Sequence, residues 1–307
     1  MMGWLHSRRL HYWFGAVAIL FVVLAVLRGV FFIGFSGFEL SALGDVDTIP
    51  ETLGIGLRFD LRLAILLMLP VAVLTWLPVW NLIRSRALRW LARLYLVLAL
   101  AAVFLIYIFD FGHYAYLGVR LNATALRFLE DAQISTDMIW QTYPVIWITL
   151  GWLLVTALVS WLLLRLERVT LDRTAKPISR LSLVWGSALM VVLVFLGLLG
   201  RLENINLENP VPLRWSDAFY SGDNQVAALG LNPVIFLYDT MKVPHKPYDR
   251  EQVAAHYDAV SRYLGVDQPD AETLSFIRHQ APQPYAVAAS QPPNVVFIML
   301  ESLGTSA

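Results

Sequence analysis

WFGAVAILFVVLAVLRGVFFIGF, residues 13–35, is the stretch of sequence that decides the fold, and a single charge, Arg28, interrupts it. A helix needs roughly 20 apolar residues to cross about 30 Å of hydrocarbon, so this run is long enough to span a membrane. It is longer than the apolar core of a secretory signal, and no small-residue cleavage site follows Phe35. We therefore expect a transmembrane helix rather than a cleaved leader.

Four further apolar runs follow: Leu63 to Ile83, Leu91 to Phe109, Tyr143 to Leu164 and Leu181 to Gly200. Hydrophobic residues make up 58% of the chain and charged residues only 15%, against about 25% charged in a soluble domain. This composition excludes a soluble globular protein and a disordered chain. We expect an all-α polytopic membrane bundle with five transmembrane helices within residues 1–200.

The charge and cysteine counts exclude two further classes. Lys plus Arg and Asp plus Glu both number 23, so the chain has no excess positive charge with which to bind nucleic acid. Cysteine is absent, which excludes a disulfide framework and a thiolate site.

Basic residues gather in alternate connections between the runs. Lys and Arg in short loops mark the cytoplasmic side of a membrane. They precede the first run (Arg8, Arg9), separate the second from the third (Arg84, Arg86, Arg89, Arg93), and separate the fourth from the fifth (Arg165, Arg168, Arg173, Lys176, Arg180). The remaining connections are mainly acidic. We therefore expect a cytoplasmic N-terminus, five crossings, and an outer location for everything after Gly200.

The charged residues near the predicted spans could either form structural ion pairs or contact lipid headgroups. Arg28 lies near the outer end of its run, where a long side chain reaches the lipid headgroups. In GLRFDLR, residues 56–62, Arg58 and Asp60 lie on opposite faces of a strand, or about 200° apart on a helix. Asp60 is therefore expected to pair with Arg28 or Arg62, as a structural ion pair. The alternative is that Arg58 or Arg62 contacts a headgroup phosphate.

The segments expected outside the membrane carry their own helix signals. The periodicity from Arg120 to Gln141 predicts an amphipathic helix on the outer leaflet. We expect residues 201–290 to form a helical linker on the outer face. Within this linker, Asn232-Pro233 predicts the start of a short helix. A second helix is expected from Arg250 to Leu264, capped by Asp249 and closed by Gly265.

The last residues change character again. Asn294 to Leu300 is an uninterrupted apolar run that fits a strand buried on both faces of a parallel sheet. Glu301-Ser302 follows at its carboxyl end, where open α/β sheets place ligands and where a carboxylate suits a hard divalent cation. A surface turn is the simpler alternative.

PNVVFIMLES at 293–302, after five spans and a Pro-rich linker, resembles the lipoteichoic acid synthase and phosphoglycerol transferase group of the sulfatase superfamily. GLRFDL at 56–61 and Asn-Pro at 232–233 are also similar to that group. The resemblance implies that residues 291–307 begin a sulfatase-like α/β catalytic domain. It implies that Glu301 is a ligand of a catalytic divalent ion, manganese in these enzymes.

By the same resemblance, the protein would move phosphoglycerol from phosphatidylglycerol to a glycan or glycolipid on the outer face of the bacterial inner membrane, through a phospho-threonine intermediate. In the family, the threonine and the remaining Asp and His ligands lie well after this glutamate. Ser302, Thr305 and Ser306 are too close to Glu301 to match that threonine. We therefore expect the chain to hold the membrane anchor, the linker and one strand of a truncated catalytic domain, and to be inactive alone.

Three alternatives remain at this stage. Phosphoethanolamine transferases share a similar five-span plan, but they have Gly-Glu-Thr where this chain has Leu300-Glu301-Ser302. A non-catalytic membrane subunit that lacks the catalytic head is the second. A transporter is disfavoured because few charges lie inside the apolar runs.

Overall fold

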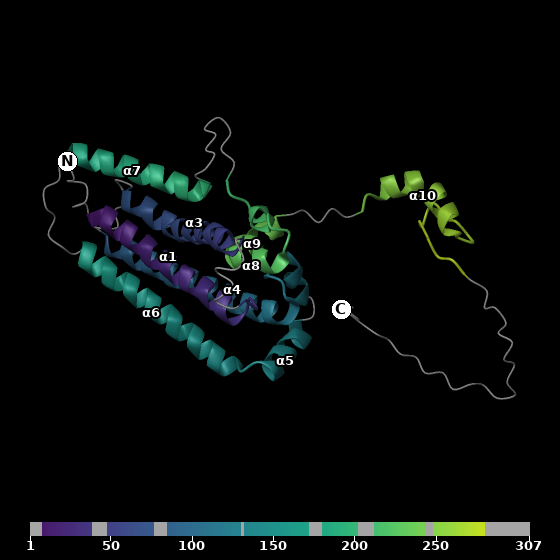
Figure 1. Cartoon of the computed structure of the whole chain (residues 1–307), viewed down its shortest axis with the longest axis horizontal. Helices are drawn as coiled ribbons and strands as arrows, with labels where there is room; N and C mark the ends of the chain where they lie inside the picture. The colour runs from purple at the N-terminus through teal and green to yellow at the C-terminus, as the bar shows by residue number, and fades with distance from the viewer. Residues whose placement is uncertain are drawn as a thin grey trace. The chain divides into compact units, whose positions relative to one another are not determined.

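The computed structural model describes residues 8–38, 48–76, 85–129, 132–171, 180–201, 212–242 and 248–279. Every regular element in these ranges is helical, and none of the ranges contains a strand. In chain order the elements are α1 (Arg8–Gly34), α3 (Thr48–Trp76), α4 (Arg86–Leu117), η2 (Ala123–Leu129), α5 (Ala132–Thr142), α6 (Val145–Leu171), α7 (Arg180–Leu199), η3 (Trp215–Phe219), α8 (Asn224–Gly230), α9 (Pro233–Met241) and α10 (Arg250–Leu264) (Figure 1).

Three of the described helices, α1, α4 and α6, are long and apolar enough to cross a membrane. The apolar part of α7, Val184–Leu199, is shorter. Helix α3 begins at Thr48, well before the predicted start at Leu63, and continues through Pro70. The stretch 56–62 is therefore helical. The end of that predicted run, 77–83, lies outside the described residues.

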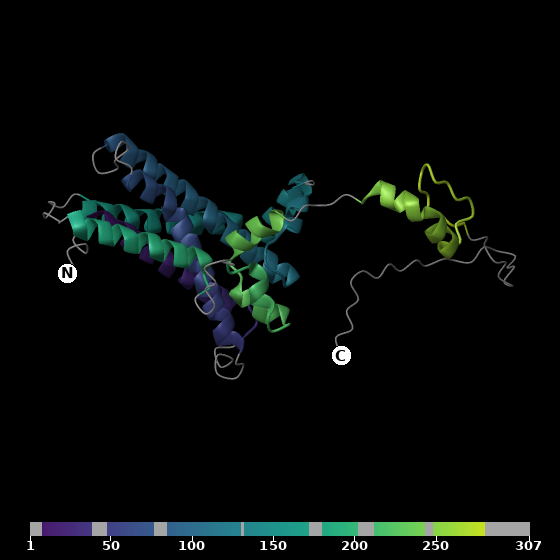
Figure 2. The same ribbon diagram turned by 90° about the horizontal axis from the view of Figure 1, so that it is seen from above.

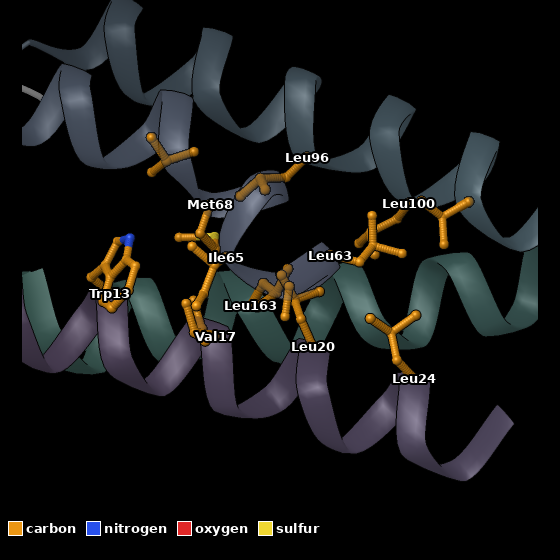
Figure 3. Close-up of a cluster of buried hydrophobic side chains, with 14 of the residues drawn as sticks. Trp13, Val17, Leu20, Leu24, Leu63, Ile65, Met68, Leu96, Leu100 and Leu163 are labelled. Carbon is orange, nitrogen blue, oxygen red and sulfur yellow. The ribbon is translucent and has the colours of Figure 1, made fainter. Parts of the chain in front are cut away.

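The bundle has a continuous apolar core. One face of α1 contributes Trp13, Val17, Leu20 and Leu24, all nearly inaccessible to solvent. Figure 3 shows these side chains facing others from α3, α4 and α6: Leu63, Ile65, Met68, Leu96, Leu100 and Leu163. The opposite faces of these helices expose Val, Leu and Trp side chains. Apolar residues on both sides of a helix are the pattern of a bundle surrounded by lipid.

One end of the bundle collects the basic residues that the sequence assigns to the cytoplasmic side. Arg93 of α4 forms a two-pronged ion pair with Glu167 of α6, with Nε–Oε2 and Nη2–Oε1 distances of 2.9 and 2.8 Å. Arg8 donates from Nη1 to the carbonyl of Leu171 at 2.9 Å. The starts of α1 and α4 are thus tied to the end of α6.

The segment after α7 folds against the opposite end. Figures 1 and 2 show α8 and α9 together where α1 finishes. Helix α8 packs closely on α3, because a Cβ at Gly230 would lie 2.9 Å from Cγ2 of Thr52 and 3.0 Å from Cβ of Ala218. A side chain at residue 230 would force the two helices apart. Residues 212–242 therefore belong to the same compact unit as the bundle, which extends to Val243.

A second unit contains α10 and the turn that follows it. Asp249 caps α10 by accepting from the amides of Glu251 and Gln252, and Gly265 ends it with a φ of 68°. The hydroxyl of Tyr257, a buried residue, accepts from the amide of Asp270 at 2.9 Å and donates to the carbonyl of Ser275. This hydroxyl holds the turn against the helix.

The linker predictions have mixed outcomes. The helix from Arg250 to Leu264 and its caps are confirmed, and so is the short helix predicted to begin at Asn232-Pro233, which starts at Pro233 with Asn232 as its cap. The single helix predicted from Arg120 to Gln141 is wrong, because η2 and α5 are separate elements. The strand predicted from Asn294 to Leu300, and Glu301 after it, lie outside the described residues.

Candidate functional site

Arg28 of α1 has a partner for every N–H group of its guanidinium. Nε and Nη2 donate to the two carboxylate oxygens of Asp60, each at 2.7 Å. Nη2 also donates to the carbonyl of Gly56 at 2.9 Å, and Nη1 donates to the carbonyls of Leu229 and Leu231. Arginine has five N–H donors, so none remains for a lipid phosphate. The expectation that Arg28 reaches the headgroups is wrong, because the side chain is buried in this network.

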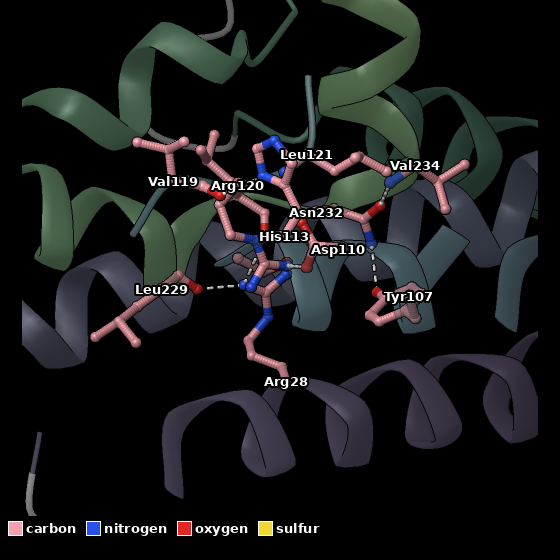
Figure 4. Close-up of polar contacts among 12 residues, drawn as sticks. Arg28, Tyr107, Asp110, His113, Val119, Arg120, Leu121, Leu229, Asn232 and Val234 are labelled. Atoms are coloured by element: carbon pink, nitrogen blue, oxygen red, sulfur yellow. Dashed lines mark hydrogen bonds and ion pairs between the residues drawn. The ribbon is translucent and has the colours of Figure 1, made fainter. Parts of the chain in front are cut away.

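Asn232 joins the same network from the segment after α7. Its Nδ2 donates to Oδ1 of Asp60 at 2.8 Å. The same Nδ2 also donates to the hydroxyl of Tyr107 at 3.0 Å (Figure 4). Its Oδ1 accepts from the amides of Val234 and Ile235, which caps α9. One side chain therefore both starts a helix and fastens it to α3 and α4.

A second buried ion pair lies beside the first. Arg120, which follows α4, approaches Oδ2 of Asp110 through Nη2 at 3.1 Å, and Oδ1 of Asp110 accepts from the amide of Leu121 at 2.9 Å. The guanidinium lies over the ring of Phe31 at 3.9 Å. Nε and Nη1 of Arg120 have no hydrogen-bond partner in the described chain. Burial lowers the pKa of Arg120, and the Asp110 carboxylate opposes that shift.

We call these six residues, Arg28, Asp60, Tyr107, Asp110, Arg120 and Asn232, the polar cluster. Its two guanidinium groups and two carboxylates balance in charge. Each of the six side chains is at least nine-tenths inaccessible to solvent. Removing one partner of a buried ion pair typically costs roughly 3–5 kcal/mol. Loss of one member of the polar cluster is therefore expected to weaken helix packing at this end of the bundle.

The predicted headgroup contacts occupy different positions on α3. Arg62 is buried and donates from Nη1 to the carbonyl of Leu213 and from Nη2 to the carbonyl of Leu199, each at 2.7 Å. It fastens the end of α7 to the segment that follows. Arg58 is half-buried. The choice between Arg28 and Arg62 as the partner of Asp60 is resolved in favour of Arg28.

No group of three or more His, Cys, Asp or Glu side chains within the described ranges is placed to hold a metal ion. The carboxylate of Asp60 accepts from Arg28 and Asn232, and that of Asp110 faces Arg120 and accepts from the amide of Leu121. The contacts of the polar cluster join α1, α3, α4 and the start of α9. The predicted metal ligand, Glu301, lies outside the described residues.

Sequence reasoning found part of the polar cluster. Arg28 inside an apolar run and Asp60 at the start of the next were identified as a possible pair. Tyr107, Asp110 and Arg120 were missed, although a carboxylate near the end of an apolar run signals a buried partner. Asn232 was identified only as a helix cap, because its second role depends on a contact with a residue far away in the chain.

Comparison with family models, with curated proteins and with solved structures finds no match to this chain.

Proposed function

We propose that this chain is the membrane anchor and linker portion of a sulfatase-superfamily transferase. The transferase moves phosphoglycerol from phosphatidylglycerol to a glycan or glycolipid on the outer face of a bacterial inner membrane. The chain crosses that membrane five times, through α1, α3, α4, α6 and α7. The anchor carries the catalytic head on the side opposite the basic end of the bundle.

The meeting of two separate sequence stretches supports this proposal most directly. GLRFDL at 56–61 and Asn-Pro at 232–233 both carry the resemblance to this family. In the structure, Asp60 of the first accepts a hydrogen bond from Asn232 of the second at 2.8 Å. The two stretches that carry the resemblance therefore meet in one hydrogen-bond network.

The position of the linker also favours an anchoring role. Helices α8 and α9 are fastened at the end where α1 finishes, away from the basic residues near Arg93 and Glu167. The chain after α9 therefore leaves the bundle at the end away from those basic residues. A head carried on that side would act on lipids of that leaflet, where proximity to the substrate raises the effective concentration of the reacting groups.

Membrane orientation is testable with single cysteines, because the chain has none of its own. Ala87→Cys places a thiol at the basic end and Asn224→Cys places one at the linker end, both at exposed positions. In intact spheroplasts, we expect a membrane-impermeant maleimide to label residue 224 at once and residue 87 only after permeabilisation. The reverse pattern would overturn the orientation.

The activity is testable in the protein at its native length in its source membrane. With phosphatidylglycerol labelled in its headgroup glycerol, we expect label to appear in a glycan or glycolipid in the presence of manganese. Glu301→Ala should abolish that transfer without reducing membrane insertion. Glu272→Ala is the matched control, because Glu272 is an exposed acid in the second unit.

Two results would contradict the proposal. Undiminished transfer by Glu301→Ala would remove the metal-ligand role. Transfer from phosphatidylethanolamine, with none from phosphatidylglycerol, would instead favour the phosphoethanolamine alternative.

A further inference from the structure

An apolar groove lies at the basic end of the bundle, away from the polar cluster. Its volume is about 490 Å³, within the range of roughly 300–1,000 Å³ that ligand sites occupy. Residues from α1, α6 and α7 line it: Leu10, His11, Phe14, Gly15, Leu166, Thr170 and Leu193. Helix α1 forms the floor, and α6 and α7, which both pack on α1, supply the walls.

Gly15 determines the shape of this groove. A Cβ at residue 15 would lie 3.0 and 3.1 Å from the two Cδ atoms of Leu166. The missing side chain lets Leu166 rest against the backbone of α1. The polar members of the lining are His11, which is exposed, and Thr170, whose hydroxyl donates to the carbonyl of Leu166 at 2.7 Å. The interior therefore offers only apolar surface to an occupant.

The mouth of the groove carries positive charge. Thr170 lines the groove, and the guanidinium of Arg8 donates to the carbonyl of the next residue, Leu171. The first turn of α1 contains Leu10 and His11, and the dipole of a helix favours anions at its N-terminus. An apolar channel with a cationic mouth is complementary to an amphiphile with a negative head.

We propose that this groove binds one acyl chain of an anionic phospholipid, whose phosphate lies beside Arg8 at the basic end. The site is separate from the transferase proposed above, because it lies at the opposite end of the bundle from the linker. Lipid tails are as apolar as the lining of the groove. The apolar lining of the groove therefore does not distinguish one acyl chain from another by polarity. Discrimination between lipids comes from the interaction of the headgroup with the positive charge at the mouth.

Lipid retention in the purified full chain tests this site. The protein is extracted in mild detergent, exchanged into mixed micelles with equal amounts of phosphatidylcholine and either phosphatidylglycerol or phosphatidylserine, and analysed by native mass spectrometry. We expect both anionic lipids to be retained over phosphatidylcholine by about five-fold, the effect of one basic residue at a lipid surface. Phosphatidylserine is not a proposed substrate, so its retention separates this site from substrate binding.

Two variants locate the bound lipid. Leu193→Trp fills the groove and should abolish the preference, whereas Val191→Trp, on the far side of α7 at a position 67% exposed, should not. Arg8→Gln should make anionic and zwitterionic lipids equal. Arg165→Gln removes a charge that lies over the Trp161 ring and should leave the preference intact.

Equal retention of all three lipids by the wild-type chain would overturn the proposal. So would an anionic preference that survives Leu193→Trp in a protein with unchanged helix content and size. If Arg8→Gln fails to fold, the test rests on the other two variants: the anionic preference should be lost in Leu193→Trp and kept in Val191→Trp.

Discussion

Asn232 donates a hydrogen bond from Nδ2 to Oδ1 of Asp60 across 2.8 Å, although 172 residues separate the two in the chain. The same carboxylate is held by Arg28. This contact brings together the start of α9, the middle of α3 and the C-terminal half of α1. The folded position of α8 and α9 therefore depends on a few side chains that can each be changed.

Asn232→Ala is expected to loosen α8 and α9. The substitution removes a helix cap worth about 1 kcal/mol and leaves buried polar atoms of Asp60 and Tyr107 short of a partner, at a further cost of roughly 1–3 kcal/mol. Hydrogen exchange should rise at the amides of residues 225–241. Asn224→Ala, at an exposed position in the first turn of α8, should leave exchange unchanged. Equal exchange in both variants would contradict the role of Asn232.

Gly56→Ala is expected to destabilise the bundle, because a Cβ there would overlap the guanidinium of Arg28. Overpacking of this kind typically costs about 1–3 kcal/mol. Gly54→Ala is the matched control on the same helix, since a Cβ at residue 54 meets nothing within 4 Å. That control should be neutral or stabilising by up to about 1 kcal/mol. Denaturation by sodium dodecyl sulfate in mixed micelles measures the difference.

Arg28→Lys is expected to be poorly tolerated despite keeping the charge. A lysine has three donors at a single point, whereas Arg28 reaches two carboxylate oxygens and three carbonyls. Leaving such acceptors unpaired should lower the free energy of unfolding by at least about 2 kcal/mol. Arg165→Lys, at an exposed side chain, should have little effect. Equal unfolding midpoints for the two variants would contradict a stabilising role for the contacts of Arg28.

Tyr257→Phe tests the second unit independently. The loss of one hydroxyl leaves the amide of Asp270 and the carbonyl of Ser275 without their shared partner. We expect faster hydrogen exchange across residues 265–279, with α10 itself retained. Tyr263→Phe is the control, because this side chain on the same helix is 90% exposed. If the two variants exchange alike, the Tyr257 hydroxyl does not hold the turn.

Local signals predicted the helices after the bundle, whereas the only long-range contact anticipated was the ion pair of Asp60 with Arg28, as one of two options. The limits of α10 follow from Asp249 and Gly265, whose effects on the backbone are complete within one turn. The cap at Asn232 followed in the same way. The sequence left Arg28 with two alternatives, because its long side chain could reach a lipid headgroup as well as the carboxylate of Asp60. Only the fold shows that three backbone carbonyls and a carboxylate already surround it.

The helix predicted from Arg120 to Gln141 failed for a local reason. The periodicity was sound, but Asn122 accepts from the amide and the hydroxyl of Thr124, which favours a turn at the start of the segment. Arg120 is also drawn inward by Asp110. A buried charge and a side-chain turn together overrode the apolar pattern, and η2 formed in place of the first half of the helix.

The hydrogen bonds of Arg62 have a practical consequence for protein engineering. Its guanidinium binds the carbonyls of Leu199 and Leu213, and the amide of Leu213 donates to the carbonyl of Leu199 at 2.7 Å. Leu199 and Leu213 are thus held side by side, and doubling the length of a chain segment closed between two such fixed ends adds only about 0.6 kcal/mol of closure cost. An epitope or a fluorescent reporter inserted between residues 202 and 211 should leave the helices undisturbed and give microscopists a handle on the intact protein.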